Sequence, residues 1–473
     1  MKDDLVKIRV ADIYLDESIY PRENIDHKRI NIFVENLRDE FLFDPIEVQL
    51  YPGKKGRYRI LDGAHRWSAC KKAGQIEINA IVKTLYKIDP LLYAAKMAIG
   101  PRQLTEVETK NTARRAFNAN PKLTSSEIGK SIGRSRQTVD SYIADLRATN
   151  LLALGLKVFH LNQLGIPQER IAKRLDVLQQ TISSYLQEMP EMAFLVNSDL
   201  AKGYTVPQVA QKHGWPEPLV WSQSLKSKGD QTRFKELNWA LKPWDVWDFN
   251  DGDKRFGDAR PNRMPAQVIA HILYFFSKPG DLVFDPMAGG GVCPDTCLAM
   301  ERRCWSLDMD DRPDTRPEIE PWHWDLEGKW ENLPIMNAKK KPDLIIWEPP
   351  RFDIAEKGDG KRDISGLSKT EYLRFFEKFF FFLKKISKKK TRLGFIFTDF
   401  RDYENCPADQ EDPNQAILID AYCKVLKTTG WKLTHIIQTP LSSERFSAEL
   451  TTPMQKKRIL GVTSRYVLIL KGV

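Results

Sequence analysis

The fold of the carboxyl-terminal half is decided by Leu282-Val-Phe-Asp-Pro-Met-Ala-Gly-Gly-Gly-Val292, a short apolar run that leads into an acidic residue and three consecutive glycines. Glycines after a buried strand let the backbone turn tightly and approach a ligand closely, as nucleotide-type cofactors require. A second apolar run, Asp343-Leu-Ile-Ile-Trp-Glu-Pro-Pro-Arg-Phe352, ends in a carboxylate and two prolines. A rigid turn at the end of a parallel strand directs polar groups into the crevice where α/β domains bind ligands. Together the two runs predict a ligand-binding α/β domain.

Helical and strand patterns alternate on both sides of these runs, which is typical of a parallel sheet covered by helices. The sequence predicts an amphipathic helix over 369–384 and another helix over 416–428. Further strands are expected at 393–397, 433–438 and 466–470.

In this order and at this distance, the two runs resemble the cofactor and catalytic motifs of amino-group DNA methyltransferases, which use S-adenosylmethionine. The resemblance implies a Rossmann-like methyltransferase domain over residues 231–473, with a helix over 263–280 before the glycines and a second strand over 305–308. It implies that the acid at the end of Trp305-Ser-Leu-Asp308 binds the ribose hydroxyls and that Asp325 lies near the adenine amino group. The candidate cofactor-binding residues are Asp285, Pro286, Ala288, Gly289, Gly291, Asp308 and Asp325.

The candidate catalytic residues are Glu348, Pro349, Pro350 and Phe352. The family motif begins with Asp, Asn or Ser, and its acceptor polarises the exocyclic amine of a flipped-out base while an aromatic ring stacks on that base. The longer side chain of Glu348 displaces the carboxylate by roughly an ångström, which can cost about 100-fold in rate. Two interpretations stay open: an active DNA methyltransferase favouring adenine over cytosine, or a partition or regulatory protein whose methyltransferase domain has lost its chemistry.

A different domain is indicated near the amino terminus, where strand patterns at 8–13, 46–51, 58–61 and 78–82 alternate with turns and helices. The third pattern is followed by Asp62-Gly-Ala-His-Arg-Trp67. A glycine at a strand–helix junction frees backbone amides, and an arginine three positions later can reach an anion at the helix N-terminus. The segment resembles the Gly-x-x-Arg box of ParB-like domains, so residues 1–88 are expected to form an α+β head of the ParB/sulfiredoxin kind.

That resemblance implies that the head binds a nucleoside triphosphate with magnesium. The phosphate-binding candidates are Gly63, His65 and Arg66. For Arg66, a structural salt bridge that holds the helix in place is an equally good interpretation, and for His65 a partly exposed helix residue is the better one.

An internal repeat connects the two ends of the chain. Residues 127–143 and 170–186 share the pattern of a helix-turn-helix, and residues 209–220 form a third, worn copy that we interpret as structural. In such units the second helix enters the major groove of duplex DNA. The DNA-binding candidates are Arg134, Ser135, Arg136, Gln137 and Thr138 in the first copy and Gln179, Gln180 and Thr181 in the second. We expect an all-α middle with the first copy in 89–150 and the others in 151–230.

Composition agrees with a multidomain α/β protein that acts on nucleic acid. Lys and Arg number 73 against 63 Asp and Glu, a net charge of +10 that suits a polyanion such as double-stranded DNA. The six cysteines form no Cys-x-x-Cys pair, which argues against zinc and indicates a reducing, cytoplasmic setting. The amino terminus lacks a signal pattern, and no apolar run approaches the roughly 20 residues that span a bilayer. A homodimer is common among ParB-like proteins, yet no heptad segment supplies a zipper.

Overall fold

The computed structural model describes residues 5–86, 88–98, 104–249, 252–259, 263–324, 330, 333, 340–350, 364, 367–399, 418–441, 448–458 and 460–472. The chain divides into two compact units, Met1–Leu154 and Gly155–Val473. This division falls inside one long helix, α6 (Arg136–Gln163). The finer domain boundaries at 88, 150 and 230 stay predictions.

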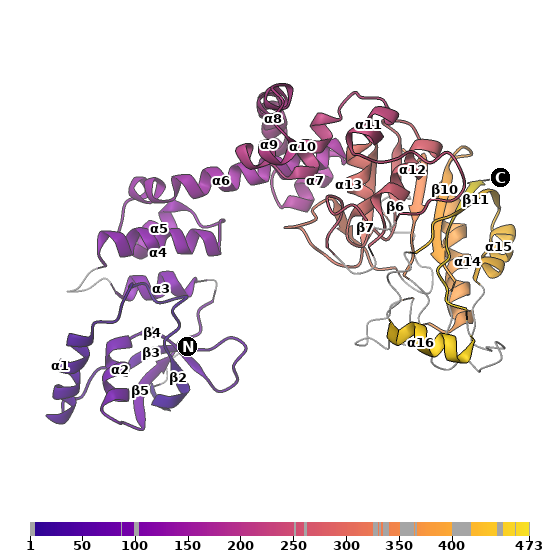
Figure 1. Ribbon diagram of the computed structural model, residues 1–473. Coiled ribbons are helices and arrows are strands. Elements are labelled where there is room, and N and C mark those ends of the chain that lie inside the picture. Colours follow the sequence, from indigo (N-terminus) through magenta and orange to yellow (C-terminus); the bar gives the residue numbers. More distant parts are fainter. Residues whose placement is uncertain are drawn as a thin grey trace. The chain divides into compact units, whose positions relative to one another are not determined.

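The first unit contains a five-stranded mixed sheet in the order β1-β5-β3-β4-β2 (Figure 1). Its strands are β1 (Leu5–Arg9), β2 (Ile13–Tyr14), β3 (Ile46–Leu50), β4 (Tyr58–Asp62) and β5 (Glu77–Val82). The expectation of one strand over 8–13 is wrong, because a 3-10 turn at Val10–Asp12 separates β1 from β2. The two pieces then pair with different partners, β1 with β5 and β2 with β4.

Helices complete the first unit: α1 (His27–Arg38), α2 (Ala64–Lys72), α3 (Pro90–Met97), α4 (Glu106–Ala119), α5 (Ser125–Ile132) and the start of α6. Helix α5 and α6 form the helix-turn-helix that the sequence predicts. Thr124 and Glu127 cap α5 reciprocally, and Gly133 ends it with a left-handed φ of 67°. Ile128 and Val139 are buried between the two helices.

The second unit contains a seven-stranded sheet in the order β11-β12-β10-β9-β6-β7-β8 (Figure 1). Every neighbouring pair is parallel except those that involve β12. The chain leaves β6 toward β7 on one side and reaches β9 and β10 on the other, so strand order reverses between β6 and β9. In open α/β sheets, ligands bind at such a switch point. The strands are β6 (Leu282–Asp285), β7 (Arg303–Asp308), β8 (Ile319–Pro321), β9 (Leu344–Trp347), β10 (Arg392–Thr398), β11 (Trp431–Gln438) and β12 (Arg465–Gly472).

Helices cover both faces of this sheet, among them α12 (Ala266–Phe276), α13 (Val292–Ala299), α14 (Lys369–Ile386) and α15 (Leu418–Thr428). A further helix, α16 (Ala448–Lys457), lies between β11 and β12 along the chain. Phe376 of α14 and Tyr422 of α15 share one aromatic core with Phe395 of β10. The adjacent Gly394 faces Ile272 of α12 instead, at 3.3 Å from an added Cβ. Since successive residues of a strand face opposite sides, α12 covers the other face of the sheet.

Five helices precede the sheet in the second unit after α6: α7 (Gln168–Leu175), α8 (Gln179–Ala201), α9 (Val206–His213), α10 (Glu217–Ser224) and α11 (Asp230–Glu236). The third repeat copy is α9 and α10, with Gly214 at a left-handed φ of 67° between them. Helix α10 packs against α13, inside the same compact unit.

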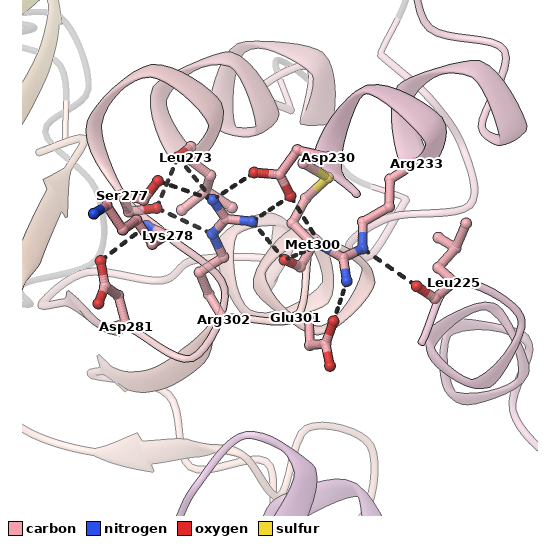
Figure 2. Close-up of polar contacts among 10 residues, drawn as sticks. All are labelled: Leu225, Asp230, Arg233, Leu273, Ser277, Lys278, Asp281, Met300, Glu301 and Arg302. Atoms are coloured by element: carbon pink, nitrogen blue, oxygen red, sulfur yellow. Dashed lines mark hydrogen bonds and ion pairs between the residues drawn. The ribbon is translucent and has the colours of Figure 1, made fainter. Parts of the chain in front are cut away.

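A buried ionic cluster fixes α11 to the end of α12 (Figure 2). Asp230 receives a bidentate pair from Arg302, at 2.6 and 2.8 Å, and a third hydrogen bond from Arg233 at 2.8 Å. Arg302 also donates to the carbonyls of Leu273 and Ser277, which end α12. Both guanidinium groups are fully buried, and each is paired, Arg302 with Asp230 and Arg233 with Asp230 and Glu301. Removal of one partner would leave an unpaired buried charge, so the joint depends on every member of the cluster.

Across the ranges that the structure describes, no helix combines the length and the apolar character needed to cross a membrane.

Candidate active site

A cavity of about 310 Å³ lies at the switch point of the large sheet. Its wall comes from the segment after β6, the end of β7 and the turn after β9. This arrangement brings together six predicted residues from the two sequence runs with Asp308 from the strand between them: Asp285, Ala288, Gly289, Glu348, Pro349, Pro350 and Asp308. Pro286 and Gly291 belong to the same loop but are not among the residues that line the cavity.

The glycine loop needs glycine at two positions for different reasons. Gly289 has a φ of 52° with open space around an added Cβ, so only its backbone conformation excludes other residues. Gly291 has a φ of 82°, and an added Cβ would lie 2.8 Å from the guanidinium carbon of Arg316. Gly291 is also the N-cap of α13, so the loop presents backbone amides at the start of that helix.

Two carboxylates flank the loop and differ in how deeply they are buried. Asp285 is almost fully buried and accepts a hydrogen bond from the amide of Met287 at 3.1 Å. Burial raises the pKa of Asp285 well above its ordinary value, and nearby Cys304 and Asp308 add to the rise. Asp308, at the end of β7, is half-buried and accepts a hydrogen bond from the amide of Gly289 at 2.7 Å.

The Pro-Pro turn is held by a tyrosine that the sequence reasoning did not single out. The hydroxyl of Tyr372, on α14, donates to the carbonyl of Pro350 at 3.0 Å. Glu348 lines the main cavity and also a recess of about 10 Å³ beside Tyr372 and Phe397. A recess of that size holds about one water molecule, so a base can enter on this side only if the surrounding segments move.

Two predicted site residues, Asp325 and Phe352, lie outside the described residues. Their expected roles, contact with adenine and stacking on the base, therefore stay predictions.

An ionic network behind the loop escaped the sequence reasoning altogether. Arg316 donates to Asp258 at 2.9 Å, to Asp295 at 2.8 Å and to Glu318 at 3.1 Å. Asp295 also accepts from the amide of Gly257, and Arg312 donates to the carbonyl of Gly289. No short motif could have revealed this network, because its members come from three separate segments.

Comparison with known families agrees with this geometry. Residues 1–95 match the family model described as the ParB N-terminal domain, and residues 139–312 match the one described as DNA methylase. The chain carries a ParB-like domain and a DNA methylase domain. The methylase match includes the second helix-turn-helix copy and the glycine loop and ends before the Pro-Pro turn at Glu348.

The chain is also similar to curated ParB proteins. It is 27% identical over 154 residues to the chromosome-partitioning protein ParB of Myxococcus xanthus, which covers 32% of this chain and 48% of that one. It is 25% identical over 224 residues to a probable ParB of Vibrio cholerae, 44% and 75% of the two chains. The chain thus spans about half the length of the Myxococcus protein.

Two solved structures, one of a ParB protein and one of a methyltransferase, share less sequence identity with this chain. The ParB of Caulobacter crescentus complexed with CTP-gamma-S shares 19% identity at a TM-score of 0.20, covering 30% of this chain and 77% of that one. A TehB-like SAM-dependent methyltransferase from Corynebacterium glutamicum shares 13% identity at a TM-score of 0.26, covering 43% and 87%.

The ParB-like domain contains a larger cavity, of about 800 Å³, at the start of α2. Gly63, His65 and Arg66 all line it, and Gly63 caps α2 with a φ of 92°. Arg66 pairs with Asp62 at 2.6 Å and donates to the carbonyls of Asp44 and Pro45. The structure therefore shows the salt bridge that the sequence left open for Arg66, within the wall of the cavity.

The first helix-turn-helix copy leaves part of its second helix accessible. Three candidates are exposed: Ser135, Arg136 and Gln137. Thr138 is half-buried, and its backbone amide donates a hydrogen bond to the Ser135 hydroxyl. Arg134 pairs with Glu106 of α4 at 3.0 Å, which occupies its guanidinium within the domain. Three of the five candidates are thus available at the surface.

The second copy is anchored to the methylase domain through its first helix. The Arg170 guanidinium stacks 3.7 Å from the ring centre of Trp305 and pairs with Glu320. Arg174 pairs with Asp311 at 2.6 Å and donates to the carbonyl of Ile319 at 2.8 Å. In the second helix, Gln179 and Gln180 are exposed and Thr181 is half-buried.

Proposed function

We propose that the protein transfers a methyl group from S-adenosylmethionine to an exocyclic amine of a DNA base, with adenine favoured. The observation that carries this proposal is the single cavity wall shared by the glycine loop, Asp308 and Glu348. A volume of about 310 Å³ falls at the lower end of the range for small-molecule sites, roughly 300–1,000 Å³.

The residues present suit the cofactor. Left-handed glycines at 289 and 291 permit close backbone approach. Each oxygen of the Asp308 carboxylate accepts one backbone amide, from Gly289 and from Asp310, and keeps a second lone pair for a ribose hydroxyl. Asp285 shapes the loop by accepting the amide of Met287. When bound, S-adenosylmethionine supplies a methyl group on a sulfonium, which is strongly electrophilic.

The chain itself must hold and polarise the target amine. The carboxylate of Glu348 and the carbonyl of Pro349 accept hydrogen bonds from that amine, which leaves its nitrogen lone pair directed at the methyl group. Tyr372 positions the turn through its hydrogen bond to Pro350. Exposed residues of the helix-turn-helix copies hold the duplex through backbone and base contacts.

The test is transfer of isotopically labelled methyl groups to unmethylated duplex DNA, followed by digestion to nucleosides and identification by mass. Label in methyladenine supports the full proposal, and label in methylcytosine corrects the base. Glu348→Ala should lower the rate on the order of 100-fold or more, because an aligned acid–base partner contributes about 10²–10⁴. Glu191→Ala, at an exposed position of α8, serves as the matched control and should leave the rate unchanged.

Cofactor binding by equilibrium dialysis separates loss of chemistry from loss of the site. Binding without transfer, on synthetic duplexes and on the host's own genomic DNA, would favour a DNA-binding regulator with an inactive methylase domain. An unchanged rate in Glu348→Ala would remove Glu348 from the mechanism.

For the ParB-like domain we propose binding of a nucleoside triphosphate with magnesium. Support comes from the cavity of about 800 Å³, whose wall carries Arg22, Lys28 and Arg29 beside the amides at the start of α2. Isothermal titration with cytidine triphosphate and magnesium tests this, with Arg29→Ala expected to weaken binding at least about tenfold by removing a charged contact. Absence of heat with every nucleoside triphosphate would overturn it.

A further inference from the structure

Three cysteines from two separate elements meet beneath the glycine loop. Cys293 and Cys297 lie four residues apart on α13, and Cys304 lies on β7. Their sulfur atoms all lie within 4.8 Å of one another, and all three side chains are buried. The sequence argues against zinc because it lacks a Cys-x-x-Cys pair, but helical spacing puts two thiols on one face and the sheet supplies the third.

These thiols have the polar surroundings of a ligand set. The Cys304 sulfur lies 3.2 Å from the hydroxyl oxygen of Ser306, within hydrogen-bond distance.

We propose that Cys293, Cys297 and Cys304 bind one thiophilic divalent cation of the zinc class. Soft thiolates select such ions, and Zn–S bonds of about 2.3 Å place two bound sulfurs roughly 4 Å apart, within the spacing found here. Three S–H bonds break as three metal–sulfur bonds form, and the three protons leave to solvent. No change of oxidation state is involved.

The thiol cluster borders the cofactor-side cavity through one of its members. Cys293 lines that cavity, so an ion and a water molecule as fourth ligand can approach this thiol from there. The bound ion would join α13 to β7 directly under the glycine loop. It would thereby stabilise the loop independently of methyl transfer.

A second ligand set competes for this assignment. His160, Asp295 and Glu318 also place ligand atoms within 4.8 Å of one another. The guanidinium of Arg316 contacts both carboxylates, at 2.8 and 3.1 Å, and this cation opposes a second one at the same oxygens. The thiol cluster has no such competing charge in hydrogen-bond contact with its sulfurs among the described residues.

The test is titration of the full-length reduced protein with Cd²⁺, which gives a thiolate-to-cadmium charge-transfer band, followed by displacement with Zn²⁺. We expect one equivalent bound, and at least about tenfold weaker binding in Cys297→Ala and in Cys304→Ala, since even outer ligands change metal affinity 10–100-fold. Cys70→Ala, in the ParB-like domain and also buried, is the matched control and should keep the band. Far-ultraviolet circular dichroism checks that each variant is folded.

Every other outcome speaks against the proposal. If Zn²⁺ binds but His160→Ala removes it and the cysteine variants keep it, the ion belongs to the carboxylate set. If the band persists in both cysteine variants, the thiolates lie elsewhere. If wild-type protein shows no band, the three thiols serve as packing alone.

Discussion

Asp308 Oδ2 accepts a hydrogen bond from the backbone amide of Gly289 at 2.7 Å. This bond joins the end of β7 to the loop after β6, two segments that meet because β6 and β7 are parallel neighbours. The carboxylate proposed to hold the ribose therefore also fixes the loop that faces the rest of the cofactor. Loss of one side chain should disturb both.

Replacement of Asp308 should weaken cofactor binding without abolishing the fold. A hydrogen bond to a charged group is worth about 1.5–3 kcal/mol, so Asp308→Ala should raise the dissociation constant of S-adenosylmethionine roughly 10- to 150-fold. Asp308→Asn, which keeps an acceptor oxygen for the Gly289 amide, should raise this dissociation constant less. Equilibrium dialysis measures both, and equal affinity in all three proteins would exclude Asp308 from the site.

Two glycines with nearly the same φ allow the effect of backbone strain to be separated from the effect of a side-chain clash. Gly291 and Gly280 have φ values of 82° and 81°, but only Gly291 has a neighbour, Arg316, against an added Cβ. Gly280→Ala should lower the free energy of unfolding by about 1–2 kcal/mol through backbone strain alone. Gly291→Ala should lower it further and also weaken cofactor binding, because Arg316 must shift.

Denaturant unfolding and cofactor dialysis on both variants check this. Equal losses of stability, with unchanged cofactor affinity in Gly291→Ala, would show that Arg316 moves aside without consequence for the loop.

His271 should make stability depend on pH. Its ring is fully buried in α12, accepts the amide of Lys242 at 3.0 Å and contacts the carbonyl of Gln267 at 2.6 Å, an arrangement that suits the neutral form. Burial lowers the pKa of His271 from 6.5 to about 4. The unfolded chain thus binds a proton below pH 6.5 that the folded chain binds only below about pH 4.

The free energy of unfolding should therefore fall as the pH is lowered from 6.5 to 4, by about 3 kcal/mol from this group, and this contribution should level off below pH 4. His271→Gln, which can keep both hydrogen bonds without titrating, should show a correspondingly shallower dependence. Urea unfolding of the wild type and of His271→Gln across this pH range measures the difference. If the free energy of unfolding changes with pH equally in both proteins, groups other than His271 determine its pH dependence.

The first helix-turn-helix copy should separate base recognition from backbone contact. Gln137→Ala should weaken the free energy of binding to a preferred DNA site by about 1–3 kcal/mol. It should also reduce the discrimination between bases at the contacted position, as expected for a lost base contact. Arg136→Ala should weaken binding uniformly across sequences and reduce the salt slope by about one, as expected for a lost phosphate contact. Lys110→Ala, at an exposed position of α4, is the control for general loss of positive charge. Binding titrations at several salt concentrations test all three.

The sequence predicted what depends on local backbone chemistry. A strand that runs into glycines, and a strand that ends in Glu348 and two prolines, can hardly form anything other than loops at strand ends. Gly133 likewise marks the turn of the helix-turn-helix, because it ends α5 in a left-handed conformation. The same local logic failed at residues 8–13, where a 3-10 turn interrupts the expected strand.

Partner choice could not be derived in this way. Arg66 pairs with Asp62, a salt bridge that the sequence left open beside an anion-binding role, and Arg170 of the second copy contacts the ring of Trp305, for which the sequence held no prediction. Each choice depends on which segment lies opposite, and an arginine side chain can reach several acceptors from one position.

By itself, the sequence determined the position of the glycine loop, the acid at the end of β9 and the helix-turn-helix turns, because backbone conformation is set by neighbouring residues. Only the tertiary structure decided that Asp308 holds the loop, that Arg316 braces it from behind and that Cys304 joins Cys293 and Cys297. These contacts join residues on separate elements, and sheet order, which no short motif encodes, brings such elements together.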